Sequence, residues 1–362
     1  MKIAFYGSSL LSSYWNGAAT YYRGILSALA PLGYDITFYE PDAFGRQQYR
    51  DIDPPAYATS VVYPATPDGL AQVLSQAAKA DIVVKASGVG VFDDELLTGI
   101  LVNAHPGALR LFWDVDAAAT LEEIRADPGH PTRAALPHLD AVFTYGGGPP
   151  VIAAYTALGA RSCVPVYNAL DPATHHPAAP DPRFTSDLAF LANRLPDRER
   201  RVEDFFLEAA ARSPANSFLL GGNGWYDKPM PPNVRAIGHV GTADHNAFNC
   251  SAQAVLNVAR DSMAEIGFSP ATRVFEAAGA GACLITDAWE GIELFLQPDQ
   301  EVLVARDGPD VAAHLQALTP DRARAIGAAA RTRVLAHHTY AQRAVIVDAL
   351  FRNRLQPLTT GR

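Results

Sequence analysis

Short hydrophobic runs alternate with longer helical patterns along the whole chain, and this alternation limits the fold more than any other feature. In the first half, the runs that predict strands lie at residues 2–6, 35–39, 61–63, 81–85, 109–113 and 141–145. Segments with helical periodicity, such as 21–32 and 67–79, lie between them. Strands that alternate with helices of about a dozen residues indicate βαβ units around a parallel sheet. The sequence therefore predicts an α/β fold.

The same pattern restarts after a proline-rich stretch at residues 172–182. The later strand-like runs lie at 187–191, 217–220, 234–237, 254–258 and 282–286. A chain of 362 residues is long enough for two domains at about 100–200 residues each. We therefore expect two Rossmann-like, doubly wound parallel-sheet domains facing a central cleft. Such sheets bind ligands beyond the carboxyl ends of their strands, so we expect the site in that cleft.

Composition excludes several classes of protein. The chain has 38 acidic and 29 basic side chains, a formal net charge of −9, which argues against a nucleic-acid partner. No apolar run approaches the ~18 residues of a membrane span, and the first residues predict a strand rather than a leader, so we expect a cytoplasmic protein. Its three cysteines form no CxxC pair, which argues against a disulfide framework or a cysteine-rich zinc site.

Residues 267–287 are the most informative segment. Ser269 is a good helix N-cap and Pro270 a good first helical residue, so a helix is predicted to begin here. The free N–H groups at such a terminus bind phosphate. Glu276, about two turns farther along, could accept hydrogen bonds from ribose hydroxyls, and Arg273 could pair with it or contact phosphate. We expect Thr272, in the first turn, to contact the same ligand.

A family resemblance is carried by residues 276–285, EAAGAGACLI. This segment resembles the C-terminal domain of GT-B glycosyltransferases, and is closest to the CgeB-like (spore-maturation) branch beside the family-4 enzymes. The resemblance implies that Glu276 binds the donor ribose, and that a last helix within 336–362 crosses back to the N-terminal domain. The implied domains are 1–168 on the acceptor side and 169–335 for the nucleotide-sugar donor. Family-4 enzymes carry an earlier Glu where this chain has Phe268, with Glu265 as an alternative.

Residues 187–200 resemble the strand and basic loop that open the donor domain in this family. There the family places an Arg and a second cation on the diphosphate. Arg194 matches the first role and Arg198 the second, with Arg200 or Arg201 as alternatives. Arginine suits phosphate because its planar fork makes paired, charge-assisted hydrogen bonds. A solvated basic helix start is the structural alternative.

Two further donor-side positions follow later strands. Gly222, within the GGNGW run at 221–225, resembles the glycine-rich turn of the same domain, where glycine lets the backbone approach a ligand. His239 follows the run at 234–237, where these folds usually contact the base through backbone groups. A plain tight turn is the alternative for Gly222.

In the first half, polar residues that flank strand ends resemble the acceptor-side loops of the family. The predicted acceptor-side residues are Ser8, Asn16, Gly17 and Lys85. The aromatic side chains of Trp15, Tyr21 and Tyr22 either stack on an acceptor or pack in the core.

Residues 113–116, WDVD, resemble the Asp-x-Asp metal motif of GT-A glycosyltransferases. Three residues are a weak match, and GT-A folds lack a second complete doubly wound domain. We therefore expect no metal and no other cofactor, with Asp114 lining the cleft as the catalytic base. Asp116 suits the cap of the next helix. His175, in the proline-rich stretch, is typical of a solvated loop.

Together these features predict a metal-independent glycosyltransferase of the hexosyltransferase type. It would move a sugar from a nucleoside diphosphate-sugar to a hydroxyl-bearing acceptor, either a small molecule or a glycan. Arginine and a helix N-terminus would stabilise the leaving diphosphate. The alternatives are a GT-B-type sugar epimerase or phosphorylase, or a noncatalytic nucleotide-binding relative.

Overall fold

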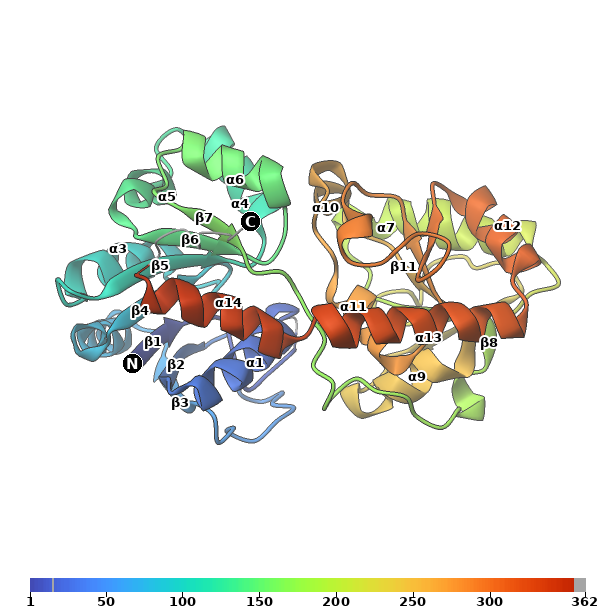
Figure 1. Ribbon diagram of the computed structural model, residues 1–362, viewed down its shortest axis with the longest axis horizontal. Coiled ribbons are helices and arrows are strands. Elements are labelled where there is room, and N and C mark those ends of the chain that lie inside the picture. Colours follow the sequence, from blue (N-terminus) through green and yellow to red (C-terminus); the bar gives the residue numbers. More distant parts are fainter. Residues whose placement is uncertain (15, 355–362) are drawn as a thin grey trace. The chain divides into compact units, whose positions relative to one another are not determined.

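The computed structural model describes residues 1–14 and 16–354. Internal contacts divide the chain into two compact units (Figure 1). Unit 1 contains Met1–Asn168 together with the described residues from Tyr340 onward, and unit 2 contains Ala169–Thr339. The second boundary therefore lies at 339/340, where the sequence placed it at 335/336. Each unit is described by itself.

Unit 1 is built around a seven-stranded parallel sheet with strand order β3-β2-β1-β4-β5-β6-β7. The strands are β1 Lys2–Tyr6, β2 Asp35–Asp42, β3 Thr59–Pro64, β4 Ile82–Ala86, β5 Leu109–Asp114, β6 Ala141–Thr144 and β7 Cys163–Pro165. The helices are α1 Ala18–Leu29, α2 Pro67–Leu74, α3 Asp93–Asn103, α4 Ala117–Ala126, α5 Pro131–Ala135, α6 Gly148–Ala157 and α14 Tyr340–Arg352, with short 3₁₀ turns at Ala30–Leu32, Ser75–Lys79 and Leu136–His138.

The central strands of unit 1 are buried on both faces, as continuous apolar runs require in a parallel sheet. In β1, Phe5 pairs with Phe38 of β2 and with Val84 of β4, and all three are fully buried. Helix α14 packs on α1, where the ring of Tyr340 fills the space beside Gly24. A Cβ at Gly24 would lie 2.2 Å from that ring, so the close approach requires glycine.

Unit 2 is built around a six-stranded parallel sheet with strand order β10-β9-β8-β11-β12-β13. The strands are β8 Ser186–Leu191, β9 Phe218–Gly221, β10 Val234–Gly238, β11 Ala252–Asn257, β12 Leu284–Asp287 and β13 Leu303–Ala305. The helices are α7 Pro196–Val202, α8 Glu208–Arg212, α9 His245–Ser251, α10 Asp261–Ile266, α11 Thr272–Ala280, α12 Gly308–Ala317 and α13 Pro320–His337, with a π-helical turn at Glu203–Leu207 and 3₁₀ turns at Pro182–Phe184, Thr242–Asp244 and Ile292–Leu294.

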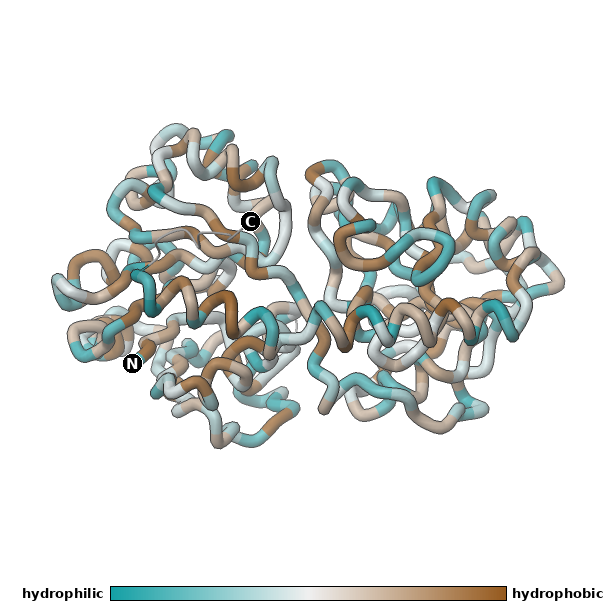
Figure 2. Tube along the Cα trace, in the orientation of Figure 1, coloured by the Kyte–Doolittle hydropathy of each residue, from teal (hydrophilic) through white to brown (hydrophobic). Residues whose placement is uncertain are grey.

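Helices cover both faces of the unit 2 sheet. Helices α9, α11 and α13 pack together, while α8 and α12 form a second group. The hydrophobic stretches run through the interior of each unit, and many surface loops are hydrophilic (Figure 2). The strand order reverses between β8 and β11, so the loops after these strands flank a switch point of the kind where doubly wound sheets bind ligands.

The predicted fold class is confirmed: both sheets are parallel and doubly wound. Two local predictions were wrong. Strand β13 was missed because it has three residues, below the usual strand length of about five. Helix α11 begins at Thr272 after the N-cap residue Ala271, and Ser269 instead donates a hydrogen bond to the Gly267 carbonyl. Among the described residues, no helix is both long and apolar enough to span a bilayer.

Candidate functional site

Three loops meet at the carboxyl ends of β8, β9 and β10 in unit 2. The Gly222 N–H donates to the Gly238 carbonyl at 2.6 Å, which ties the ends of β9 and β10 together. Gly222 has φ +115°, and a Cβ there would lie 2.1 Å from the Ala192 carbonyl oxygen. Only glycine fits this position without moving the backbone. The predicted glycine turn is thus a tight packing point between two strand ends.

Arg194 lies in the loop after β8 and is held by two carboxylates. Its Nη2 atom lies 2.7 Å from Glu199, and its Nη1 atom 2.7 Å from Asp227. The hydrogen bond to Glu199 and the charges of both carboxylates raise the pKa of Arg194. Two internal counterions already neutralise this cation. The geometry therefore gives Arg194 a role in joining the loops, where the sequence predicted a direct diphosphate contact.

Arg198, by contrast, stands in a cluster of cations with Arg260 and Arg273. Burial, Arg273 and Arg260 lower the pKa of Arg198 to about 10, although Asp197 opposes the shift. Its Nη2 atom donates to the Asn193 carbonyl at 2.8 Å. Within the described part of the chain, its buried Nε–H has no hydrogen-bond partner. Arg260 is also paired with Asp197, and a bound anion would offset the remaining positive charge and satisfy the free donor of Arg198.

The first turns of α11 contribute Thr272, Arg273 and Glu276 to the same unit. Burial raises the pKa of Glu276, but nearby His175, Arg273 and His245 and a hydrogen bond from Thr272 together lower it more, so the net shift is downward. The Nε2 atom of His175 lies 3.9 Å from a Glu276 carboxylate oxygen. Glu276 is therefore a carboxylate set among cationic and titratable groups.

The two histidines beside Glu276 come from distant segments. His175 is 6% exposed, so the prediction of a solvated loop at His175 was wrong. His245 is the first residue of α9, and its ring centroid lies 6.4 Å from that of His175. Burial lowers the pKa of His245, although Glu276 opposes the shift.

The remaining donor-side candidates lie outside this cluster of interactions. Ser269 is buried and bonded to Gly267. His239 is exposed after β10, and Glu265 is exposed on α10. The Arg200 side chain is 88% exposed. Arg201 is bound to the buried carboxylate of Asp287 at 2.6 Å.

In unit 1, Ser8 and Asn16 contact each other in the loop that follows β1. The Ser8 hydroxyl donates to the Asn16 side-chain oxygen at 2.9 Å, and the Asn16 amide donates to the carbonyls of Ser9 and Ser12. Both side chains are buried, so they shape the loop rather than present polar atoms to solvent. Gly17 is exposed at the start of α1, with open space around its Cα.

Lys85 forms a salt bridge within unit 1. Its Nζ atom lies 2.6 Å from Asp93, and the Lys85 side chain is 4% exposed. Asp93 in turn accepts hydrogen bonds from the N–H groups of Val89 and Gly90. Lys85 therefore stabilises the loop after β4 and the start of α3.

Asp114, predicted as the catalytic base, is fully buried. One carboxylate oxygen accepts hydrogen bonds from Ser87 Oγ at 2.7 Å, Thr120 Oγ1 at 3.0 Å and the Asp116 N–H at 3.0 Å. The other accepts the hydroxyl of Tyr155. Burial raises the pKa of Asp114 despite these bonds. A carboxylate with four internal donors and no exposed surface suits a structural role. Asp116 precedes α4 but makes no side-chain cap bond there.

Aromatic residues near the same loops divide into two groups. Tyr21 and Tyr22 are buried core residues, and Trp15 lies outside the described residues. The exposed group was not predicted from the sequence; in it, the rings of Tyr14 and Tyr49 stack with centroids 4.1 Å apart. Phe44, 58% exposed, lies under the Arg46 guanidinium.

Within unit 2, the structure therefore brings together Arg198, Arg273, Thr272 and Glu276, whereas Ser269, His239 and Arg200 lie outside this cluster. Three side chains of the candidate site lie outside the set predicted from the sequence: Arg260, His175 and His245. Arg260 lies two residues after the run at 254–258, so the rule about strand ends would have selected it. No local signal marks the two histidines. In the described residues, no group of three or more His, Cys, Asp or Glu side chains is arranged to hold a metal ion.

Comparison with known proteins adds a family match over part of the chain. Residues 198–348 match the model of a family described as glycosyl transferase-like. No curated protein sequence matches this chain.

Solved structures match over nearly the whole length. An alpha-glucosyltransferase in complex with UDP superposes with a TM-score of 0.72 at 11% identity, covering 97% of this chain and 100% of that one. Sucrose-phosphate synthase from Thermosynechococcus elongatus gives 0.69 at 14%, covering 98% and 99%. The fold is GT-B. HepE from Anabaena, in complex with UDP and glucose, gives 0.68 at 11% identity, covering 98% and 100%, and shares this GT-B architecture.

Proposed function

We propose that this GT-B protein is a glycosyltransferase that moves a sugar from a nucleoside diphosphate-sugar to a hydroxyl-bearing acceptor. The observation that carries the proposal is the buried Nε–H of Arg198, which has no hydrogen-bond partner in the described chain, together with Arg273 in the first turn of α11. The match of residues 198–348 to a glycosyl transferase-like family supports it. Transfer of a hexose and membership of the CgeB-like branch are finer parts of the same proposal.

Unit 2 would bind the donor. Arg198 offers an unpartnered Nε–H to the diphosphate, and Arg273 adds a second positive charge from α11. The free N–H groups of the first turn of α11 favour the same anion. Glu276 would accept hydrogen bonds from the ribose hydroxyls, because its lowered pKa keeps it ionised as an acceptor. UDP is the first nucleotide to test, since solved structures of similar fold contain it.

During transfer, the bond between the anomeric carbon and the donor oxygen breaks, the acceptor oxygen bonds to that carbon, and the acceptor hydroxyl releases its proton to solvent. The departing diphosphate gains negative charge. Fixed cations stabilise the diphosphate more in the transition state than in the ground state. Loss of one such group typically costs about 10²–10³ in rate. Arg198 and Arg273 would supply this effect, while Arg194 and Gly222 hold the loops that position Arg198.

Unit 1 would hold the acceptor. Ser8, Asn16 and Lys85 fix the loops from within, and the exposed rings of Tyr14, Phe44 and Tyr49 offer stacking surfaces. Aromatic faces pack well against the C–H faces of sugar rings or against other aromatic groups. A glycan or an aromatic hydroxyl compound is therefore the proposed acceptor class.

The test is a thermal-shift titration with UDP, GDP, dTDP, ADP and NAD, each with and without EDTA. The wild type is compared with Glu276→Ala and with Glu265→Ala, which removes an exposed carboxylate as a matched control. A ligand at about 100 times its Kd should add about 2.7 kcal/mol of stability. We expect one diphosphate to stabilise the wild type and Glu265→Ala, independently of EDTA, and to lose this effect in Glu276→Ala.

Product analysis with the matching nucleotide-sugar then separates the activities. Glycosyl transfer needs an added acceptor, whereas an epimerase changes the donor alone and a phosphorylase needs phosphate. Binding without turnover across a broad acceptor panel would favour a noncatalytic relative. Absence of binding by every nucleotide would reject the donor site.

A further inference from the structure

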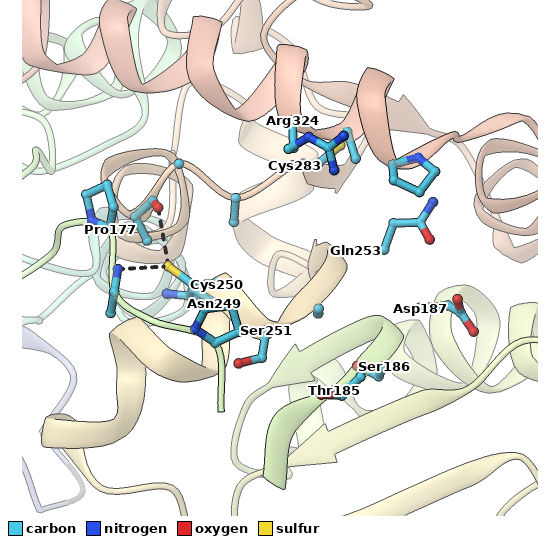
Figure 3. A pocket seen from close by; sticks show the side chains of 18 of the residues that line it. Pro177, Thr185, Ser186, Asp187, Asn249, Cys250, Ser251, Gln253, Cys283 and Arg324 are labelled. Atoms are coloured by element: carbon cyan, nitrogen blue, oxygen red, sulfur yellow. Dashed lines mark hydrogen bonds between the residues drawn. The ribbon is translucent and has the colours of Figure 1, made fainter. Parts of the chain in front are cut away.

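A cavity in unit 2 lies at the amino ends of its strands, whereas the candidate donor site lies at their carboxyl ends. Figure 3 shows residues that line this cavity. It has a volume of about 630 Å³, within the range of about 300–1,000 Å³ typical of small-molecule pockets. Its walls include Ser186 and Ala252, the first residues of β8 and β11, and Ser217, which precedes β9. A six-residue strand such as β8 spans about 20 Å, so the cavity is a separate site.

One buried side chain points to a ligand. Asn249 is 2% exposed, yet its Oδ1 atom has no hydrogen-bond partner among the described residues. Asn249 lines the cavity beside Cys250, whose sulfur accepts from the Ala178 N–H and donates to the Ala280 carbonyl. Burying an unsatisfied amide oxygen costs about 1–3 kcal/mol, so a donor that reaches Asn249 Oδ1 from the cavity would stabilise the folded unit.

The other lining groups define the chemistry of that donor. Among the described lining residues, the charged side chains are Asp187 and Arg324, one of each sign, which favours an uncharged ligand. Asp187 accepts hydrogen bonds from the N–H and hydroxyl of Ser217. The described walls carry prolines and alanines but no aromatic ring, so a nucleobase would find no stacking partner there. A compact molecule with several hydroxyl donors and exposed C–H groups fits these walls.

The cavity is linked to the donor cluster by two helices. Helix α11 begins with Thr272 at the cluster and ends with Ala280 at the cavity wall. Helix α9 begins with His245 beside Glu276 and ends with Ser251 at the same wall. The two helices pack on each other. A ligand that shifts or rigidifies their last turns therefore acts on the elements that position the cluster.

We propose that this cavity binds a neutral mono- or disaccharide as an effector, with a sugar hydroxyl donating to Asn249 Oδ1. Sugar binding is independent of the proposed donor site, whereas its effect on nucleotide affinity rests on the proposed function. Such coupling is reciprocal: the sugar changes nucleotide affinity by the same factor as the nucleotide changes sugar affinity.

The experiment uses calorimetric titration of the full chain with glucose, maltose and sucrose, without nucleotide. Ala178→Trp places a large side chain at the cavity wall, and Ala179→Trp places it on the exposed neighbour outside the wall. We expect at least one sugar to bind the wild type and Ala179→Trp saturably, and to bind Ala178→Trp at least tenfold more weakly. Asn249→Leu, which removes the unsatisfied acceptor, should weaken binding in the same way.

Saturable binding that is equal in the wild type and in Ala178→Trp would overturn the assignment, as would an absence of binding by all three sugars. In thermal melts with the same sugars, stabilisation that is equal in all variants would reflect only the general exclusion of sugars from protein surfaces. That result would also overturn the assignment of the cavity. The coupling is then measured as the Kd of UDP with and without the bound sugar. We expect a change of about fivefold or more in the wild type and none in Ala178→Trp.

The two proposals fail separately. Sugar binding that persists in Glu276→Ala while no nucleotide binds the wild type would reject the proposed function and retain the cavity site. Nucleotide binding without any sugar binding would do the reverse. An unchanged Kd of UDP, with both ligands bound, would overturn the effector role.

Discussion

The Nε2 atom of His175 lies 3.9 Å from the Oε1 atom of Glu276, although the two residues are far apart in the sequence. Together with His245 and Arg273, this contact makes the pKa of Glu276 lower than usual in spite of its burial. His245, which belongs to the same group, has its pKa lowered by burial.

Stability should fall as the pH drops below about 6.5, the ordinary pKa of histidine. Burial lowers the pKa of His245, so the unfolded chain binds this proton at a higher pH than the folded one. The stabilisation is therefore present above the unfolded pKa and is lost as pH falls toward the folded value. Urea denaturation of wild type and His245→Gln between about pH 7.5 and 5.5 measures it. A steeper loss in the variant than in the wild type would contradict the prediction.

Arg198→Ala should lower kcat/KM by about 10²–10³ with the identified donor, because it removes a cation from the proposed diphosphate site. Arg200→Ala is the matched control, since the Arg200 side chain is 88% exposed two positions along the same helix. Steady-state kinetics of both variants check this. If both lose activity equally, or neither does, Arg198 has no special role.

Asp114→Asn should destabilise unit 1 by about 1–3 kcal/mol, because the new amide N–H₂ cannot accept the bonds that the carboxylate receives. Tyr155→Phe, which removes one of these donors, should cost a similar amount. Chemical denaturation gives both values. Assayed where each variant is fully folded, kcat should stay within about tenfold of wild type; a loss near 10⁴ in Asp114→Asn alone would restore its assignment as the catalytic base.

Gly222→Ala should lower both stability and nucleotide affinity. The Cβ would lie 2.1 Å from the Ala192 carbonyl at a backbone φ of +115°, so the loop carrying Arg194 must move. Gly241→Ala is the control, because a Cβ at Gly241 meets open space. Thermal melts and nucleotide titrations compare the two. Retention of wild-type affinity in Gly222→Ala would show that this turn does not position the donor site.

Much of the fold could be predicted from the sequence because parallel strands leave a strong local signal. Runs such as 187–191 and 234–237 became β8 and β10 with small changes at their ends. The predicted start of α11 was wrong because Gly267 and Phe268 both take positive φ, which extends the turn beyond Ser269. No local pattern encodes such a turn.

The family motif selected Glu276, and the loop after a predicted strand selected Arg198; the structure places both in the candidate donor site of unit 2. The site was not predictable where tertiary partners decide a side chain's role. Arg194 lies in the expected loop, yet its guanidinium forms salt bridges with Glu199 and Asp227. Asp114 follows a strand as expected, yet Tyr155 and Ser87 enclose it.

Helix α14 has a consequence for how the protein is made. It packs on α1 through the Tyr340 ring beside Gly24, and Tyr34 donates a hydrogen bond to Asp348. Domains usually fold from the N-terminus as the ribosome releases them. Here the first unit lacks one of its own helices until unit 2 has been translated. A nascent chain stalled before Tyr340 therefore exposes the apolar side of α1, where a chaperone can bind.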